Sequence, residues 1–426
     1  MSIKNFIKAY ICKKKPNFNC LNGENLVSTE IPEITPLGAK ISGIQTKRIN
    51  ILLPSINKEH VFGGISTAIN FFKEIQNNLS EEFSYRVIIT DASASDTIDT
   101  FNKYKIVNMT QDSDEKFQLV FVNDRYEKEL PIWQNDIFIA TAWWTAFNAK
   151  ELIRIQNYFY GSSYSLIYFI QDFEPGFYQW SSRYSLAEST YKDEIKTIAV
   201  INSKELYDFM KIKKYPFSDI YYFVPKLNQK LKEFLPKLGD IKKVNRILVY
   251  GRPGVVRNAF EIVVNSLKVF AQNEKAKHWE FVSLGEKHRD IDLGNGNKLI
   301  SKGKVTLEEY ADYLLTSKIG LSLMISPHPS YPPLEMAYFG LKTITNSYEN
   351  KNLSYMHGNI VNVDDLRPSV IGNKLLELSS MEFDIKLKDF IYELSYIDEN
   401  EQFSFIKNLL NLIESRTIRK KTILFL

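Results

Sequence analysis

The stretch from Ile319 to Asn346, IGLSLMISPHPSYPPLEMAYFGLKTITN, constrains the fold of this chain more than any other. Its first six residues are mainly apolar, as in a strand buried on both faces of a parallel sheet. Three prolines and two serines then indicate a loop from Ile325 to Pro332. Pro333–Gly340 suits a helix, and Leu341–Thr345 suits the next strand. This order places polar groups at the carboxyl edge of a parallel sheet, where α/β proteins bind ligands.

Glu335 lies in the first turn of that predicted helix. Backbone amides without a helical partner and the helix dipole favour anions there. A carboxylate at this position can accept hydrogen bonds from the vicinal hydroxyls of a ribose, while neighbouring amides receive a diphosphate. The alternative is that Glu335 only caps the helix. The remainder of the chain favours the nucleotide site.

Length and composition exclude several classes of protein. A chain of 426 residues is too long for one ordinary core, so we expect two domains. A net charge of only +4 argues against a nucleic-acid-binding protein. No apolar run is long enough to span a membrane, and the basic N-terminus lacks a secretory pattern. Cys12 and Cys20 are too few for a disulfide framework or a zinc site, which favours a cytoplasmic location.

The order of the predicted strands and helices indicates an α/β fold with two Rossmann-like domains. Regular α/β patterning begins at Arg48 and, after a lysine-rich stretch, restarts at Arg246. The C-terminal sequence RTIRKKTILFL can lie on an anionic membrane surface or simply complete the packing. We therefore divide the chain into an N-terminal arm (1–46), a first Rossmann-like domain (47–225), a linker (226–243), a second Rossmann-like domain (244–398), and a C-terminal helix with its basic-apolar tail (399–426).

The first domain contains a glycine pair after its first strand. Gly63 and Gly64 introduce an amphipathic helix that carries Ser66 and Thr67 early, so backbone amides can approach a phosphate or a sugar. The pair is not the full GxGxxG fingerprint, and a tight turn without a ligand is the alternative.

The string QDFEPGFY follows a predicted strand of the same domain. Asp172 and Glu174, together with aromatic residues such as Phe173 and Tyr178, are typical of a wall that binds a sugar, because aromatic faces stack on pyranose rings. The alternative is a structural loop whose acids cap a helix or pair with Arg183.

The second domain opens with the turn Gly251-Arg252-Pro253-Gly254. Arg252 and Arg257 flank this turn, and both guanidinium groups match the oxygens of a diphosphate. Lys302 is a further candidate for a phosphate, although each of these side chains taken alone can be a solvated surface charge. The acidic string from Asp112 to Asp114 is predicted to be a solvated turn rather than a cation site.

These features together resemble a GT-B glycosyltransferase, with two Rossmann-like domains that face each other across a cleft. The strings QDFEPGFY and HPSYPPLEMAYFG resemble, more narrowly, bacterial rhamnosyltransferases of rhamnan and S-layer glycan synthesis. The match extends from about Arg48 to the C-terminus and is similar to glycosyltransferase family 4. That family's basic pair corresponds to Arg252 and Arg257, and the second of its two glutamates to Glu335. The family's first glutamate has no counterpart in this chain, because Pro327, followed by His328, occupies the corresponding position eight residues before Glu335.

The resemblance implies a metal-independent transfer of sugar from a dTDP-sugar, most simply dTDP-rhamnose, to a carbohydrate acceptor, free or lipid-linked. No cofactor and no nucleic acid are implied, and contact with the inner face of the cell membrane is compatible with the tail. Asp172 is the first candidate for orienting or deprotonating the acceptor hydroxyl, and Glu174 the second. A nucleotide-sugar epimerase and a non-catalytic nucleotide-sugar binding protein are the alternatives. The implied donor-binding residues are Arg252, Arg257, Lys302, His328, Ser330, Tyr331 and Glu335, and the implied acceptor-binding residues are Gly63, Gly64, Phe173 and Tyr178.

Overall fold

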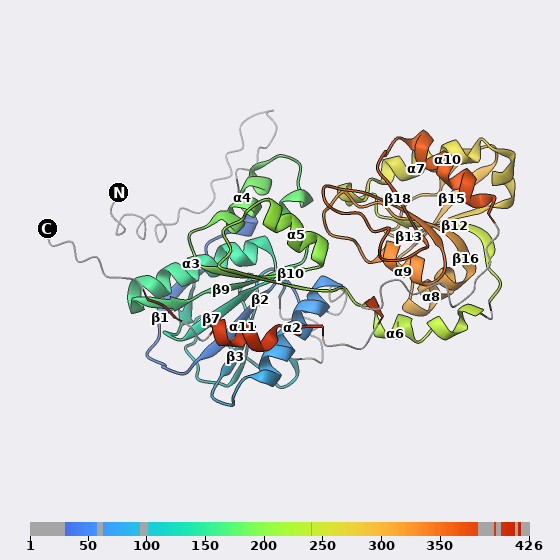
Figure 1. The fold of residues 1–426 in the computed structure, drawn as a ribbon. Coiled ribbons are helices and arrows are strands. Elements are labelled where there is room, and N and C mark those ends of the chain that lie inside the picture. Colours follow the sequence, from blue (N-terminus) through green and yellow to red (C-terminus); the bar gives the residue numbers. More distant parts are fainter. Residues whose placement is uncertain are drawn as a thin grey trace. The chain divides into compact units, whose positions relative to one another are not determined.

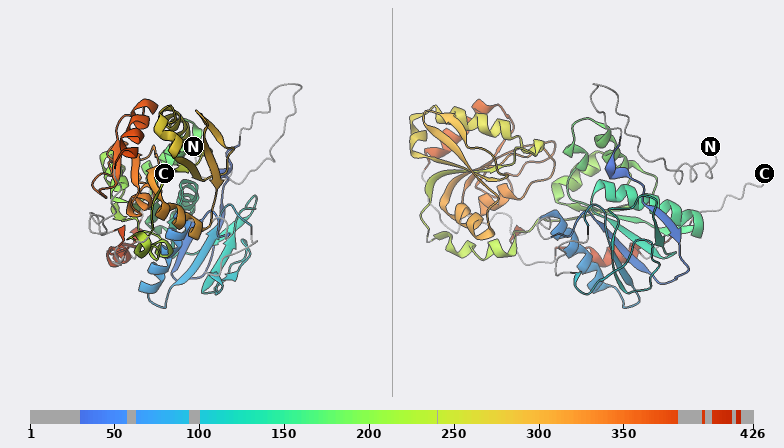
Figure 2. Two further views of the ribbon diagram at one scale, coloured as in Figure 1. Left: turned by 90° about the vertical axis from the view of Figure 1, so that its right-hand side faces the viewer. Right: turned by 180° about the vertical axis from the view of Figure 1, so that it is seen from behind.

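The computed structural model describes residues 30–57, 63–93, 101–239, 241–381, 396–397, 402–413 and 416–418. The chain forms two compact units. Unit 1 comprises the residues up to Ile201, Tyr215–Tyr221 and the residues from Phe403 onward, and unit 2 comprises Asn202–Lys214 and Tyr222–Gln402. In each unit, helices cover both faces of a central sheet (Figures 1 and 2).

Unit 1 is built on an eight-stranded sheet with the order β11-β10-β9-β7-β2-β3-β5-β4. The pairings from β10 through β4 are all parallel, as predicted from the buried apolar runs. The strands are β2 (Arg48–Leu53), β3 (Ser84–Ile89), β4 (Lys105–Ile106), β5 (Phe117–Phe121), β7 (Asp136–Ala140), β9 (Leu166–Ile170), β10 (Thr197–Asn202) and β11 (Asp219–Phe223). The helices around them in unit 1 are α2 (Gly64–Asn78), α3 (Trp143–Tyr160) and α4 (Ser182–Lys192), whereas α5 (Lys204–Ile212) lies in the segment Asn202–Lys214 of unit 2.

The two ends of the described chain differ from the sequence-based division. The part of the arm that the structure describes contains β1 (Gly38–Ile41), which pairs in parallel with β6 (Glu129–Ile132). At the other end, α11 (Ile406–Ile413) packs on α2 of unit 1, and the ring of Phe403 lies 5.2 Å from that of Phe71. The strand β19 (Arg416–Ile418) then pairs with β8 (Ser162–Tyr164). The described residues from Phe403 onward therefore belong to unit 1, where burial of Phe403, Ile406 and Leu409 stabilises the segment.

Unit 2 contains a seven-stranded sheet with the order β14-β15-β13-β12-β16-β17-β18, in which only the β14–β15 pairing is antiparallel among the described strands. The strands are β12 (Val244–Gly251), β13 (Glu280–Gly285), β14 (Ile291–Gly294), β15 (Asn297–Gly303), β16 (Ser317–Leu321), β17 (Lys342–Asn346) and β18 (Ile360–Val363). The principal helices are α7 (Phe260–Ala271), α8 (Leu307–Thr316), α9 (Pro332–Tyr338) and α10 (Pro368–Ser379). Both elements predicted around the loop of 325–332 are present, as β16 and α9.

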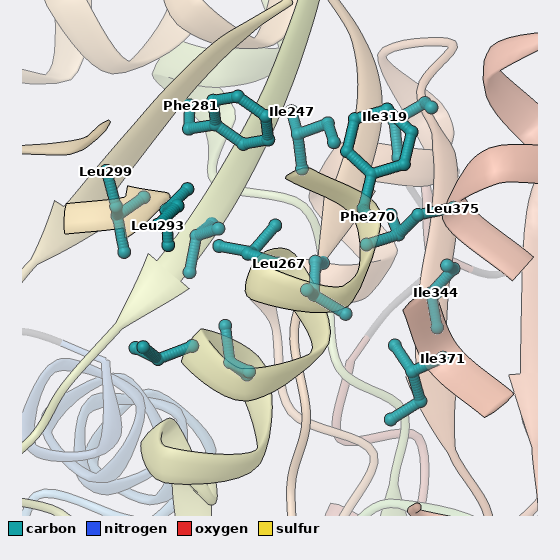
Figure 3. Close-up of a cluster of buried hydrophobic side chains, with 14 of the residues drawn as sticks. Ile247, Leu267, Phe270, Phe281, Leu293, Leu299, Ile319, Ile344, Ile371 and Leu375 are labelled. Carbon is teal, nitrogen blue, oxygen red and sulfur yellow. The ribbon is translucent and has the colours of Figure 1, made fainter. Parts of the chain in front are cut away.

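Alternating residues of β12 supply the two core layers of unit 2. Ile247 and Val249 contribute to the layer under α7 and α10, whereas Leu248 contributes to the layer with α8 and α9. Figure 3 shows Leu267 and Phe270 of α7 among the side chains of the first layer. Because both faces of the strands are buried, the strands are nearly continuous apolar runs.

The predicted linker, 226–243, is part of the folded body of unit 2. It contains α6 (Gln229–Lys232) and the 3-10 helix η4 (Leu235–Gly239), and its leucines contribute to the layer with α8 and α9. Lys243 is buried and donates to four backbone carbonyl oxygens, at 2.9–3.2 Å, including those of Leu315 and Phe339. Burial lowers the pKa of Lys243 to about 7. The segment predicted as a linker therefore packs within unit 2. Among the described helices, none is long and apolar enough to cross a membrane.

Candidate functional site

Glu335 lies near the start of α9, which follows β16 at the carboxyl edge of the unit 2 sheet. The Glu335 amide donates to the carbonyl oxygen of Tyr331 at 2.9 Å. The carboxylate accepts a hydrogen bond from the hydroxyl group of Tyr310, on α8, at 2.7 Å. Burial raises the pKa of Glu335 to about 7, although the Tyr310 hydrogen bond acts in the opposite direction. Sequence reasoning missed Tyr310, because nothing in its spacing links it to a residue 25 positions later.

The loop between β16 and α9 is stabilised by its own short-range hydrogen bonds. The amide of His328 donates to Ser326 Oγ at 3.1 Å, and the amide of Ser330 donates to His328 Nδ1 at 3.0 Å. Ser330 has a φ of 68°, a backbone conformation that is costly for a residue with a Cβ atom. The His328 and Tyr331 rings lie 5.8 Å apart, so the structure brings these three predicted donor-binding residues together with Glu335.

The close spacing between α9 and the sheet depends on Gly320 in β16. A Cβ atom at Gly320 would lie 2.8 Å from Met336 Sδ and 2.9 Å from Thr343 Oγ1. The absent side chain lets α9 approach the strand closely, which positions Glu335 at the sheet edge. Asn346 holds the start of the loop, because its side chain accepts from the amide of Met324 at 2.7 Å and donates to the Met324 carbonyl oxygen at 3.1 Å.

Arg252 and Arg257 follow β12, the strand beside β16. The carbonyl oxygen of Arg257 accepts from the amide of Ile325 at 2.7 Å, so this segment contacts the loop directly. In the turn itself, the amide of Gly254 donates to the Glu286 carboxylate at 2.8 Å, a contact that the sequence did not predict. The predicted basic pair is therefore at the same sheet edge as Glu335.

Lys302 is less closely associated with these residues. It lies exposed near the end of β15, and β13 and β12 separate that strand from β16. Three steps of about 4.8 Å between neighbouring strands put roughly 14 Å between β15 and β16. Lys302 is thus at the same edge of the sheet but not beside the loop.

Unit 1 brings the glycine pair next to the QDFEPGFY string. A Cβ atom at Gly64 would lie 2.6 Å from Oε1 of the flexible Gln171 side chain, and Gly63 has a φ of 48°, a conformation that favours glycine. Asp172 follows Gln171 directly, is buried, and its Oδ1 accepts from the Phe173 amide at 2.8 Å. The start of α2 and the loop after β9 therefore lie side by side at the carboxyl edge of this sheet.

Glu174 has a structural contact that weighs against a catalytic role. Its Oε2 accepts a hydrogen bond from the amide of Trp143, the first residue of α3, so the carboxylate caps that helix. Trp143 Nε1 donates to the Tyr178 hydroxyl at 2.9 Å, which fixes Tyr178 to the same helix start. Arg183 pairs with Glu33 at 2.6 Å, so the predicted alternative partner of the acids is engaged elsewhere.

The acidic string from Asp112 to Asp114 lies in a loop before β5, with both aspartates exposed. Asp112 Oδ1 accepts from Trp133 Nε1 at 3.3 Å, and the carbonyl oxygen of Ser113 accepts from Gln118 at 2.8 Å. These contacts agree with the predicted solvated turn. Within the described ranges, no group of three or more His, Cys, Asp or Glu side chains is arranged to hold a metal ion.

Solved structures with this architecture define the class. A TarM variant from S. aureus in complex with fondaparinux, alpha-GlcNAc-glycerol and UDP has a TM-score of 0.57 and 8% identity, covering 87% of this chain and 100% of that chain. WaaG, a glycosyltransferase involved in lipopolysaccharide biosynthesis, has a TM-score of 0.50 and 10% identity, covering 86% of this chain and 99% of that chain. The fold is thus that of the GT-B glycosyltransferases.

The family follows from the sequence matches. Residues 48–204 match the family model "WsaF, N-terminal domain" and residues 245–376 match "WsaF, C-terminal domain". Together these matches span more than half of the chain, which therefore belongs to the WsaF family. It is also 27% identical over 225 residues to the O-antigen biosynthesis protein RfbC of Myxococcus xanthus. That match covers 52% of this chain but only 16% of RfbC.

Proposed function

We propose that this protein is a glycosyltransferase that moves rhamnose from dTDP-rhamnose onto a growing bacterial polysaccharide or S-layer glycan, in the cytoplasm and without a metal ion. The glycosyl-transfer part rests on the WsaF family and the GT-B fold. The O-antigen name of RfbC and the glycan in the TarM complex support a polysaccharide acceptor. The rhamnose assignment rests on the QDFEPGFY and HPSYPPLEMAYFG strings.

The observation that carries the proposal is the surroundings of Glu335. Its carboxylate is anchored by Tyr310 at the start of α9, next to a loop that contacts the backbone of Arg257. A carboxylate in this position can accept hydrogen bonds from the two ribose hydroxyls of a uridine nucleotide, or from the single 3′-hydroxyl of a thymidine nucleotide. Because the two carboxylate oxygens offer about four acceptor sites, Glu335 can keep the Tyr310 hydrogen bond in either case.

The same edge of unit 2 can stabilise the leaving group. Breaking the bond between the anomeric carbon and the diphosphate leaves negative charge on the diphosphate. The guanidinium groups of Arg252 and Arg257 and the amides of the loop would interact with this charge as it develops, which lowers the barrier to transfer. Arginine suits this role because its planar fork donates two hydrogen bonds to phosphate oxygens.

On the acceptor side, we assign Asp172 the orientation or deprotonation of the attacking hydroxyl. Asp172 directly follows Gln171, whose side chain lies beside Gly64, and Glu174 caps α3. The same capping contact argues against the epimerase alternative, because an epimerase would need both Asp172 and Glu174 to act on opposite sides of one sugar. A non-catalytic binding protein would use Glu335 but would not depend on Asp172.

Incubation with labelled dTDP-rhamnose and a rhamnose-terminated acceptor tests the proposal. We expect a labelled acceptor that is longer by one sugar. A changed nucleotide sugar with no acceptor product would favour the epimerase, and bound but unchanged donor would favour the binding protein. UDP-sugars in parallel reactions identify the base, since a faster reaction with a UDP-sugar would contradict the dTDP assignment.

A further inference from the structure

A polar groove lies between α3 and α4 in unit 1, separate from the residues assigned above. Its volume is about 450 Å³, within the range of small-molecule sites of about 300–1,000 Å³. Phe147 and Lys150 line it from α3, and Ser185, Ser189 and Thr190 line it from α4. Phe147 is half-buried and Ser185 and Ser189 are exposed, so the groove offers an aromatic side chain and hydroxyl groups to a ligand.

The charged side chains of the groove balance one another. Lys150, Arg154 and Lys192 face Glu151, Glu188 and Asp193, and each has a partner of opposite sign within the set. Arg154 contacts Asp193 at 2.5 Å, and Lys192 contacts Glu188 at 2.8 Å. Three positive and three negative groups leave no net charge. Such a lining suits a neutral, hydroxyl-rich ligand better than a nucleotide or an anionic lipid, which would require an excess of cations.

An exposed aromatic pair adjoins the groove. Trp180 is 95% exposed, and its ring stacks on that of Tyr184 at 6.1 Å with an interplanar angle of 24°. Tyr184 immediately precedes Ser185 on α4 and lies one turn before Glu188, so it shares a side of that helix with the groove. Exposure of a whole indole to water is unfavourable, and the face of such a ring is suited to stacking on a sugar.

The groove begins close to the candidate acceptor site. Phe147 is four residues after Trp143, about 6 Å along α3, and Trp143 contacts both Glu174 and Tyr178. From Phe147 to Arg154 the groove follows α3 for about 10 Å. A linear glycan with one end near Tyr178 could therefore extend along α3 and α4.

We propose that this groove and the Trp180–Tyr184 pair form a second carbohydrate subsite, which binds sugars of the acceptor chain remote from the hydroxyl that is glycosylated. This inference rests on the proposed transferase function. It adds a preference for longer acceptors, because additional sugars gain contacts that a short acceptor cannot reach.

Two substitutions at exposed positions test the subsite with little risk to the fold. Trp180→Ala removes the stacking surface, and Ser189→Trp fills the groove. Calorimetric titration of a synthetic rhamnose tetrasaccharide, without donor, should show binding to the wild type and roughly tenfold weaker binding to each variant. In transfer assays, both variants should lose the wild type's preference for the tetrasaccharide over a disaccharide. Their KM for the disaccharide should not change.

Phe159→Ala is the matched control, because Phe159 is a 52% exposed aromatic residue on α3 that is absent from the groove. This variant should bind the tetrasaccharide as the wild type does. Equal tetrasaccharide affinity in the wild type, Trp180→Ala and Ser189→Trp would overturn the inference, as would the absence of binding to the wild type. Failure of transfer with every acceptor would instead contradict the proposed function, since the titration requires no reaction.

Discussion

Glu335 differs from an ordinary helix-capping glutamate in what surrounds its carboxylate. Glu309, at the start of α8, is exposed and forms a reciprocal capping pair with Thr306. The Glu335 carboxylate instead accepts a hydrogen bond from a side chain of another helix, Tyr310, and burial raises its pKa to about 7. A group with such a pKa near neutral pH is typical of a ligand site.

The raised pKa predicts that donor affinity depends on pH through Glu335. Only the ionised carboxylate has both oxygens available as acceptors, so dTDP-rhamnose should bind more tightly as the pH rises from about 6 to 8, through the pKa of about 7. Titration calorimetry at several pH values measures this. Glu335→Gln should abolish this part of the dependence, and an identical pH profile in that variant would contradict the assignment.

The same shift has the opposite effect on stability. Between the usual glutamate pKa of 4.5 and about 7, the folded protein binds more protons at Glu335 than the unfolded chain does. The contribution of this residue to stability therefore falls as the pH rises through that window. Denaturant unfolding measures this effect. From about pH 4.5 to 7 the free energy of unfolding of the wild type should fall more than that of Glu335→Gln, because the glutamine amide does not titrate.

Asp172 and Glu174 are expected to respond differently to amide substitution. Asp172→Asn retains the shape of the side chain but weakens it as a base, so turnover should fall about a hundredfold or more with dTDP affinity unchanged. Glu174→Gln should mainly lower the melting temperature, because it weakens the cap on α3. Steady-state kinetics and melting curves on both variants check this. Near-normal turnover of Asp172→Asn would remove Asp172 from the mechanism.

At the scale of elements, the close approach of α9 to β16 positions Glu335 and so the proposed donor site. Gly320→Ala should displace α9, because its Cβ would lie 2.8 Å from Met336 Sδ. We expect a loss of about 1–3 kcal/mol of stability and weaker dTDP binding. Gly372→Ala is the matched control, since its Cβ would lie 2.6 Å from Val269 Cγ1, on the opposite side of the sheet. It should cost stability without weakening dTDP binding, and equal effects of both variants on affinity would contradict this account.

Elements with a strong local pattern could be predicted from the sequence, and those defined by distant partners could not. Local sequence is sufficient to predict the strands β2, β9 and β16, because burial on both faces requires a run of apolar residues. It is also sufficient to predict the start of α9, because proline is favoured in the first turn of a helix. The short strands β1 and β19 pair with segments far along the chain, and no local pattern indicates such a partner. For the same reason the sequence indicated Glu335 but not its hydrogen-bond partner Tyr310.

At the scale of the whole molecule, the proposed binding of the diphosphate by protein groups of unit 2 predicts how transfer activity responds to the removal of metal ions. The diphosphate charge is assigned to Arg252, Arg257 and the amides of a loop in unit 2, so transfer activity should be the same with and without EDTA. Assays with EDTA, and with magnesium or manganese added back, measure this. Loss of activity that a cation restores would contradict the assignment and direct attention to the string from Asp112 to Asp114.

The central claim is that unit 2 binds the nucleotide of the donor through Glu335, and calorimetric titration with dTDP tests it most directly. Glu335→Ala should weaken binding by about 1–3 kcal/mol, a factor of roughly 5–150 in the dissociation constant, and should remain folded. Glu309→Ala removes the capping glutamate of α8 and should leave the dissociation constant at the wild-type value. An unchanged dissociation constant in folded Glu335→Ala would contradict the claim and reduce Glu335 to a helix cap.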